Sequence, residues 1–431
     1  MSAGAARSSS DQILPTWRDP AAWAKTADIA AVLIALALPW STSLVGIFAV
    51  VWLVAVAPTL DFKDFLQSLK RPICLLPIAL FVLALVGMFW SDAAWAVRRY
   101  ALSPVAKMLM LPLLFYHFER SARGMWVFVA FLVACTLMMA MSWLVLMYPG
   151  LSLKPVTDAE RGIFVKNYIN QSQEFALCAV ALAYPIMSFL RAKKIGLALL
   201  LGAISLGFVV NMEFVTVSRT AMVTMPIMLA VFALLHLKWR TSLMIFCLAI
   251  IMTGLAFIAS PQLRGKSDSF FREYYLYKTE NAATSIGLRL EFWRKSLLFF
   301  EQAPVLGHGT GSTRGLFEQA ASGGTNSATG EVIGNPHNQT LNVAVQWGAI
   351  GVVLLYATWI VHLLLFRGEG LVTWIGLLVV VQNIFTSLFN SHLFDFHEGW
   401  MYVLGVGVAG GMTLRIKMEE RAKEPVNPVR S

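Results

Sequence analysis

Charged residues are scarce in this sequence. Of its 431 residues 13% are charged and 58% are hydrophobic, whereas an ordinary soluble domain has roughly 25% charged residues. This scarcity excludes water as the main solvent of the protein. The formal net charge of +10 does not indicate nucleic-acid binding, because membrane proteins place Lys and Arg in their cytoplasmic loops.

Metal-type cysteine spacing is also missing. The four cysteines lie inside apolar runs, so we interpret them as small buried hydrophobic residues. The acidic residues of the predicted outer loops form no Asp-x-Asp pair, which many metal-dependent transferases use, and we expect no metal and no cofactor. The only compact candidates for a metal site are Asp395, His397 and Glu398. We interpret this group as capping and orienting the last two spans, with a supporting catalytic role as the alternative.

Long apolar runs dominate the rest of the chain. Their length of about 17 to 25 residues suits a helix that crosses the hydrocarbon layer, which takes roughly 20 residues. The first segment lacks the apolar core of a secretory signal, so the first helix should remain as an anchor. The pattern predicts an all-α, polytopic membrane helical bundle with about twelve transmembrane helices. The predicted spans lie near 26–41, 43–60, 72–90, 100–117, 124–148, 170–190, 195–213, 219–236, 241–260, 338–365, 371–390 and 399–415.

Basic clusters recur in every second connection, which favours cytoplasmic N- and C-termini. The expected division is a cytoplasmic segment 1–25, nine spans in 26–260, a large outer loop 261–337, three spans in 338–415 and a basic cytoplasmic tail 416–431. In the outer loop, apolar residues at near-helical spacing predict an amphipathic helix at 287–303 on the membrane surface. Gly, Ser, Thr and Asn in 307–334 favour a flexible lid or a substrate loop.

One stretch, Asn335-Pro336-His337-Asn338, opens the tenth predicted span. Asn335 is the expected N-cap and Pro336 suits the first helical position. His337 then falls in the first turn, where the helix dipole disfavours protonated imidazole. A neutral His337 could accept a proton there, beside amides that suit an anion. The alternative is an interfacial histidine, with hydrogen-bonding amides that join helices at Asn338, Asn342 and Gln346.

Several basic residues are predicted to lie outside, where they suit an anionic ligand. Arg219 heads the eighth span, and Arg289 shares a helix face with Trp293, an aromatic that could stack on sugar. Guanidinium groups match phosphoryl oxygens and could neutralise a leaving pyrophosphate without metal. A single arginine is otherwise an anchor to lipid headgroups. Further candidates for anion binding are Arg161, Lys166, Arg98 and Arg99.

Three motifs together resemble the O-antigen ligase family, whose superfamily also contains O-antigen polymerases and bacterial O-oligosaccharyltransferases. The first is His337-Asn338 followed by Gly348 and Gly351 at the start of a late span. The second is Ser-Arg-Thr around Arg219 at the head of a middle span. The third is an Arg-x3-Trp with a following Pro-x2-Gly-x-Gly, formed by Arg289, Trp293, Pro304, Gly307 and Gly309.

The resemblance implies a metal-independent glycosyltransferase of lipopolysaccharide biosynthesis in the bacterial inner membrane. Its donor would be polysaccharide on undecaprenyl pyrophosphate, and its acceptor lipid A-core oligosaccharide on the periplasmic face. His337 would accept the proton of the acceptor hydroxyl while Arg219 and Arg289 stabilise the leaving pyrophosphate, giving inversion. A role of His337 as a pyrophosphate ligand stays open. The residues expected to bind substrate are Asn338, Arg161, Lys166, Trp293, Arg98 and Arg99.

Other functions remain as alternatives. An O-antigen polymerase or a protein O-oligosaccharyltransferase differs in its acceptor, and the motifs do not separate them. A short basic tail in place of a sizeable C-terminal region favours the ligase. A glycolipid transporter or flippase would also use many spans and basic cavity residues, but the midplane cations and broken helices expected of it are not obvious.

Overall fold

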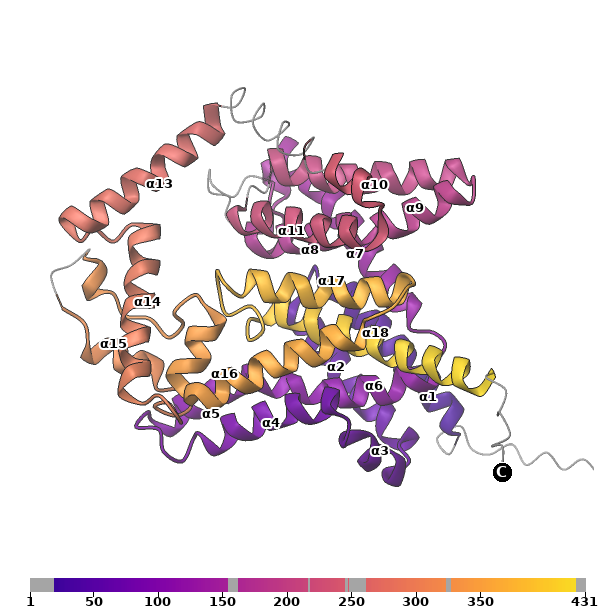
Figure 1. Ribbon diagram of the computed structural model, residues 1–431, viewed down its shortest axis with the longest axis horizontal. Coiled ribbons are helices and arrows are strands. Elements are labelled where there is room, and N and C mark those ends of the chain that lie inside the picture. Colours follow the sequence, from indigo (N-terminus) through magenta and orange to yellow (C-terminus); the bar gives the residue numbers. More distant parts are fainter. Residues whose placement is uncertain are drawn as a thin grey trace, which may run out of the picture.

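The computed structural model describes residues 19–153, 162–215, 218–244, 247, 261–322 and 327–423. In this part of the chain the structure is helical, and its one β contact is an isolated bridge between Ala282 and Ser327. The predicted all-α fold class is confirmed. Figure 1 shows the helices running along one direction, with α13, α14 and α15 gathered at one end of the bundle.

The helices of the first part are separated by short turns. They are α1 (Pro20–Ala37), α2 (Thr42–Val56), α3 (Phe62–Leu69), α4 (Pro72–Val86), α5 (Trp95–Ala106), α6 (Met110–Arg120) and α7 (Met125–Met147). The second part adds α8 (Tyr168–Ala181), α9 (Ala183–Arg191), α10 (Ile195–Phe214), α11 (Arg219–His236), α13 (Pro261–Glu280), α14 (Ser285–Gln302), α15 (Thr313–Gln319), α16 (Gln339–Leu365), α17 (Leu371–Thr386) and α18 (Phe396–Lys423).

By length and composition, seven helical stretches of the described chain can cross a membrane, or up to eight if the bent pair α3 and α4 forms one span. Two shorter apolar helices, Val223–His236 and Leu371–Thr386, add to these. A polytopic helical bundle is therefore confirmed, whereas the predicted number of about twelve spans is not. The ninth predicted span, 241–260, lies mostly outside the described residues.

Helices α6 and α18 pack closely because α18 carries glycines where they meet. A Cβ atom on Gly407 would lie 2.6 Å from Leu114, and one on Gly410 would lie 2.2 Å from Phe115. Small residues allow helix backbones to approach in this way when no hydrophobic effect drives association in lipid. The contacts also show that α6 and α18 run in the same direction.

The first and the last described helices meet the same end of the bundle. Asp28 of α1 accepts hydrogen bonds from Ser121 and Arg123, which follow α6, and it lies 2.9 Å from Nε2 of His117. Because α18 runs parallel to α6, its basic end lies there too. Figure 1 places this end opposite to α13, α14 and α15. The first and the last described helices therefore lie at the same end of the bundle.

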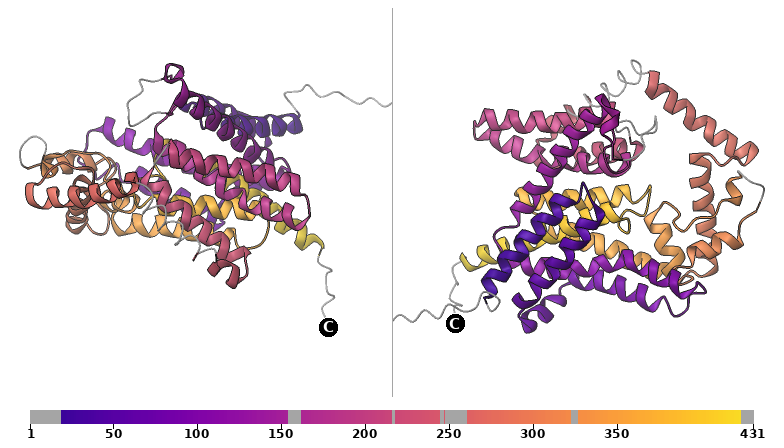
Figure 2. Two further views of the ribbon diagram at one scale, coloured as in Figure 1. Left: turned by 90° about the horizontal axis from the view of Figure 1, so that it is seen from above. Right: turned by 180° about the vertical axis from the view of Figure 1, so that it is seen from behind.

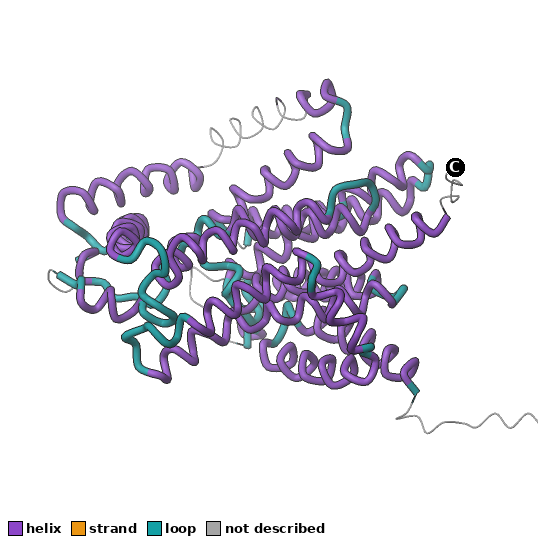
Figure 3. The backbone as a smooth tube through the Cα atoms, turned by 60° about the horizontal axis from the view of Figure 1, so that its bottom comes forward, coloured by secondary structure: helices purple, strands orange, loops and turns teal. Residues whose placement is uncertain are grey.

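The predicted amphipathic helix at 287–303 is present as α14. Its buried face packs Phe292 and Phe299 against Phe317 of α15 and Val345 of α16. Arg294 and Leu297 point outward and are exposed. Figure 2 shows from other sides that α14 lies across the end of the bundle, and Figure 3 shows that the described chain consists of helices joined by loops. The apolar face of α14 therefore packs against other helices of the protein.

Candidate functional site

His337 lies directly before α16 and has left-handed backbone geometry, with φ of 54°. Asn338 is the N-cap, and its side chain accepts a hydrogen bond of 3.1 Å from the backbone N–H of Leu341. The predictions that Asn335 is the N-cap and that His337 lies in the first turn are wrong. The residue types at Asn335 and Asn338 both suit an N-cap. The helix begins at Asn338 because its side chain satisfies the backbone N–H of Leu341, which has no partner within the helix.

The imidazole of His337 is half-buried between a helix and a loop. Its Nδ1 lies 3.0 Å from Oδ1 of Asn390, and its ring stacks on Phe292 with the centroids 6.1 Å apart. Burial lowers the pKa of His337, the positive charge of Arg289 lowers it further, and the bond to Asn390 opposes the shift. The expected neutral imidazole is thus explained by burial and a nearby cation rather than by a helix dipole.

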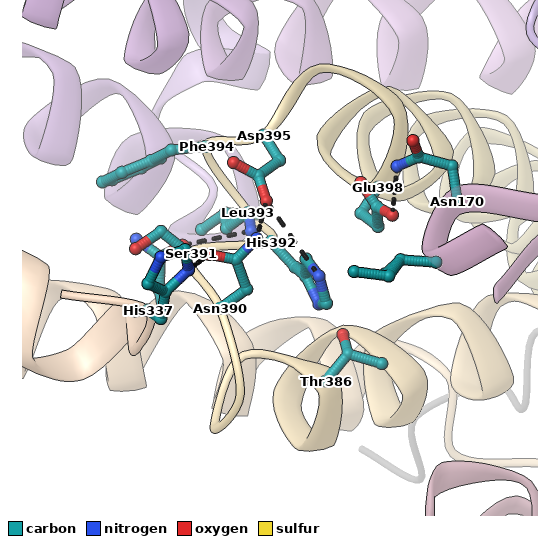
Figure 4. A network of polar contacts seen from close by, with 12 residues as sticks. Asn170, His337, Thr386, Asn390, Ser391, His392, Leu393, Phe394, Asp395 and Glu398 are labelled. Carbon is teal, nitrogen blue, oxygen red and sulfur yellow. Dashed lines mark hydrogen bonds and ion pairs between the residues drawn. The ribbon is translucent and has the colours of Figure 1, made fainter. Parts of the chain in front are cut away.

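The turn between α17 and α18 supplies the partners of this histidine (Figure 4). Nδ2 of Asn390 donates a hydrogen bond of 2.6 Å to Oδ2 of Asp395. Burial raises the pKa of Asp395 to about 7, and the charge of Glu398 adds to the rise, while Lys107 and Asn390 oppose it. His392, which is buried, faces the same carboxylate at 4.0 Å.

Arg289 reaches this site from α14. It is close enough for its charge to lower the pKa of both His337 and His392. Phe292, one turn after Arg289 on α14, stacks on His337, so two of the three predicted catalytic residues lie near one another at one end of the bundle. Trp293, one turn further along α14, packs its half-buried ring on the apolar cluster of Phe292 and Phe299, and its indole N–H is buried without a partner.

Arg219, the third predicted catalytic residue, is the first residue of α11, capped by Ser218. Its side chain lies outside the described part of the structure. Near the other end of α11, Phe232 and His236 pack on Trp374 at the start of α17. The two helices are therefore antiparallel, and the head of α11 lies toward the end of α17. This is the end that carries Asn390 and His337.

The other predicted anion-binding residues are spread over the structure. Lys166 is buried and forms an ion pair of 2.9 Å with Glu174. Arg98 donates to the backbone oxygens of Met88 and Ala93 and lies over the ring of Trp95. Arg99 is exposed, and Arg161 lies outside the described residues. Lys166 and Arg98 therefore have internal partners, which no local sequence signal indicates.

The glycine motifs join two segments near the site. Gly348 interrupts α16 with φ of 60°, and the loop after α14 enters this break. The backbone N–H of His308 donates to the oxygen of Val345 at 2.9 Å, and the N–H of Ala349 donates to the oxygen of Pro304 at 2.8 Å. The first part of the predicted lid, 307–319, is therefore a packed loop followed by α15.

The predicted amide stripe of α16 faces the protein interior. Asn338 donates to the backbone oxygen of Leu388, and Gln346 donates to Asn342 at 2.9 Å. Oε1 of Gln346 also accepts a hydrogen bond of 2.8 Å from the N–H of Gly311. These amides therefore connect the start of α16 to two loops.

Among the described residues, one group could hold a cation. Ligand atoms of His392, Asp395 and Glu398 lie within 4.8 Å of one another. His392 takes the place that the sequence suggested for His397. The buried ammonium of Lys107 donates to the backbone oxygens of Phe394 and Asp395. A positive charge thus already lies beside this cluster, and the carboxylate of Asp395 already accepts a hydrogen bond from Asn390.

A separate cavity of about 200 Å³ lies among α7, α8, α10, α17 and α18. Its lining is almost wholly apolar and includes Phe131, Leu177, Leu201 and Ile375. Such a lining suits a hydrocarbon chain and offers no group for chemistry.

Apolar helices of spanning length, with a polar site at one end of their bundle, define an integral membrane protein. Residues 204–356 match the family model described as O-antigen ligase, and this segment contains Arg219, Arg289 and His337. The match supports the assignment of the chain to the O-antigen ligase family, and the resemblance predicted from the motifs is confirmed.

A relative of similar sequence occurs in Haemophilus influenzae. This uncharacterized protein is 29% identical over 147 residues, which cover 32% of the present chain and 36% of the relative. The alignment therefore spans about a third of the length of that protein. It adds sequence similarity without a stated activity.

Proposed function

We propose that this protein is an O-antigen ligase, a metal-independent inverting glycosyltransferase. It moves O-antigen polysaccharide from undecaprenyl pyrophosphate to lipid A-core oligosaccharide. The observation that carries the proposal is the packing of α14, which carries Arg289, against His337 in the loop before α16, through the stacked rings of Phe292 and His337, inside the segment that matches the family. A base beside a cation suits a reaction in which a hydroxyl loses a proton while a pyrophosphate gains charge.

In the proposed reaction, the acceptor hydroxyl attacks the anomeric carbon of the donor. His337 takes the hydroxyl proton, the new C–O bond forms, and the bond to pyrophosphate breaks with its electron pair on the leaving group. Arg289 and Arg219 stabilise that leaving group. A single displacement of this kind inverts the anomeric centre. The proposed substrate-binding residues remain Asn338, Trp293, Arg98, Arg99, Lys166 and Arg161.

The proposed location is the bacterial inner membrane, with cytoplasmic termini and the site facing the periplasm. The support is twofold. The basic clusters favour that orientation, and the described ends of the chain lie opposite to α14, whose Phe292 stacks on His337. A lipid-linked donor would reach the site from the membrane, where the apolar cavity suits a hydrocarbon chain.

The test is transfer by purified protein in lipid nanodiscs, supplied with lipid-linked polysaccharide and lipid A-core. We expect a mass increase of the acceptor that falls by about 10²- to 10⁴-fold in His337→Ala, the usual worth of a general base. A variant with normal donor binding and unchanged transfer would disprove the role of His337. Donor consumed by another acceptor would indicate a polymerase or oligosaccharyltransferase, and donor moved intact across a bilayer would indicate a flippase.

As a matched control we choose Arg294→Ala for Arg289→Ala. Both arginines lie on α14, but Arg294 is half exposed and forms an ion pair of 2.5 Å with Glu291 on its own helix. Because Glu291 is buried, loss of this pair should destabilise the protein, but transfer per folded protein should stay within about twofold because Arg294 points outward from α14. Equal losses of transfer in Arg289→Ala and Arg294→Ala would show that these arginines affect transfer only through the folding of the protein.

A further inference from the structure

Beyond the proposed chemistry, the hydrogen bonds behind His337 determine which ring nitrogen carries the proton. They begin at the backbone N–H of His337, which donates to Oδ1 of Asn335 at 3.0 Å. A backbone N–H can only donate, so this contact fixes the oxygen of the Asn335 amide. The hydroxyl of Ser391 donates to the same oxygen at 2.7 Å. The NH₂ group of Asn335 must therefore face the other way.

That NH₂ group points at Asn390. Nδ2 of Asn335 donates to Oδ1 of Asn390 at 3.2 Å. On its other side, Nδ2 of Asn390 donates to Oδ2 of Asp395 at 2.6 Å. The neighbours on both sides thus require the same orientation of the Asn390 amide, with its oxygen toward His337 (Figure 4).

An amide oxygen can only accept, and it lies 3.0 Å from Nδ1 of His337. We infer that Asn390 is a positioning residue that holds His337 as the Nδ1–H tautomer and leaves Nε2 as the atom that takes the proton. This inference rests on the proposed role of His337 as a base. Asn390 acts through His337 and is not itself assigned a contact with substrate.

The proton balance of the step follows from this tautomer. Nε2 uses its lone pair to bind the proton of the acceptor hydroxyl, and the imidazole becomes an imidazolium with N–H groups on both nitrogens. The electron pair of the broken O–H bond goes to the acceptor oxygen, which forms the new bond to the anomeric carbon. Asn390 continues to accept from Nδ1–H, and the imidazolium later returns its proton to water.

A second function of Asn390 has to be separated from this one, because the residue also links the α17–α18 turn to the loop before α16. A linking role alone would affect folding and donor binding but not the tautomer. The wild-type protein offers a readout that needs no substitution. Histidine labelled with ¹⁵N can be measured by solid-state NMR in lipid bilayers, with the His337 signals assigned by their loss in His337→Gln.

We expect Nδ1 of wild-type His337 to be the protonated nitrogen at a pH where the ring is neutral. A ring protonated at Nε2 overturns the inference, whatever the activity. In Asn390→Leu, which removes the acceptor at similar size, we expect a shift toward the Nε2–H tautomer. The turnover number should fall by about 10- to 100-fold with little change in KM for the donor.

Asn390→Asp combined with Asp395→Asn serves as the rescue variant, because a carboxylate at position 390 also accepts from Nδ1–H, and the amide at position 395 can donate to it where Asn390 and Asp395 now share a hydrogen bond. It should restore the tautomer and raise the pH at which the ring loses its proton. Unchanged tautomer and turnover in Asn390→Leu would refute the positioning role alone, provided that His337→Ala is inactive. If His337→Ala remained active, the base proposal itself would fail while the NMR result would still decide the tautomer.

Discussion

Gly348 offers a substitution whose cost can be worked out from the structure. Its backbone has φ of 60° and ψ of −157°, a region that is essentially restricted to glycine. A Cβ atom there would lie 2.3 Å from the oxygen of Val305 and 2.7 Å from the nitrogen of Gly307. Both neighbours are backbone atoms of the loop that enters the break in α16, so neither can move aside as a side chain would.

The change Gly348→Ala should therefore be costly for two reasons. A residue held in a disfavoured backbone region costs about 1–3 kcal/mol, and an added methyl group in a packed place costs about 1–3 kcal/mol. The free energy of unfolding should fall by about 2–6 kcal/mol. Because the same loop leads out of α14, the substitution should also move Arg289 relative to His337 and reduce transfer.

The measurement is denaturant unfolding in detergent micelles, followed by tryptophan fluorescence, together with the transfer assay. Gly315→Ala is the control, since a Cβ atom at Gly315 in the nearby α15 meets nothing within 4 Å. It should leave stability unchanged or raise it by up to about 1 kcal/mol, because alanine favours a helix. Equal stability of Gly348→Ala and the wild type would refute the interlock of loop and helix.

Three further predictions concern the site itself. Arg289→Ala should lower transfer by about 10²- to 10³-fold, because it removes a group that stabilises developing charge, whereas Arg294→Ala should not. Equal transfer rates of these two variants in a side-by-side assay would remove Arg289 from the mechanism. Transfer should rise with pH toward about 7, because the pKa of Asp395 is raised and its carboxylate, which accepts from Asn390 and faces Lys107, His392 and Glu398, forms only there. In Asp395→Asn this rise with pH should be missing. An unchanged pH profile in that variant would show that the rise does not come from Asp395. Chelation with EDTA should leave transfer unaltered, and loss of activity restored by a divalent cation would instead make His392, Asp395 and Glu398 a metal site.

Much of the fold follows from local sequence, because a helix that crosses lipid needs a long apolar run. A helix is found at each predicted span except 241–260, which lies mostly outside the described residues. The number of spans did not follow in the same way. Several apolar runs form helices too short to cross alone, such as α4 and α17. Helix α4 reaches the required length only together with α3, from which it is bent by 80°.

The site was predictable only in part, because its residues come from distant segments. His337 and Arg289 were predicted from motifs, and the structure packs α14, which carries Arg289, against His337 through Phe292. Asn390 was missed because it lies 53 positions after His337, and only the packing of α17 and α18 against α16 brings it near. The buried ion pair between Lys166 and Glu174 was also not predicted, because Glu174 lies eight positions further along, inside α8, and no local pattern in the sequence indicates that the two side chains meet.

The most direct test of the account is a single-turnover transfer assay of wild-type protein and His337→Ala in nanodiscs, with donor binding measured on the same samples. The account predicts normal donor binding by His337→Ala, a rate lowered by about 10²- to 10⁴-fold, and an inverted product from the wild type. Transfer at the wild-type rate by His337→Ala, or retention of the anomeric configuration, would contradict it.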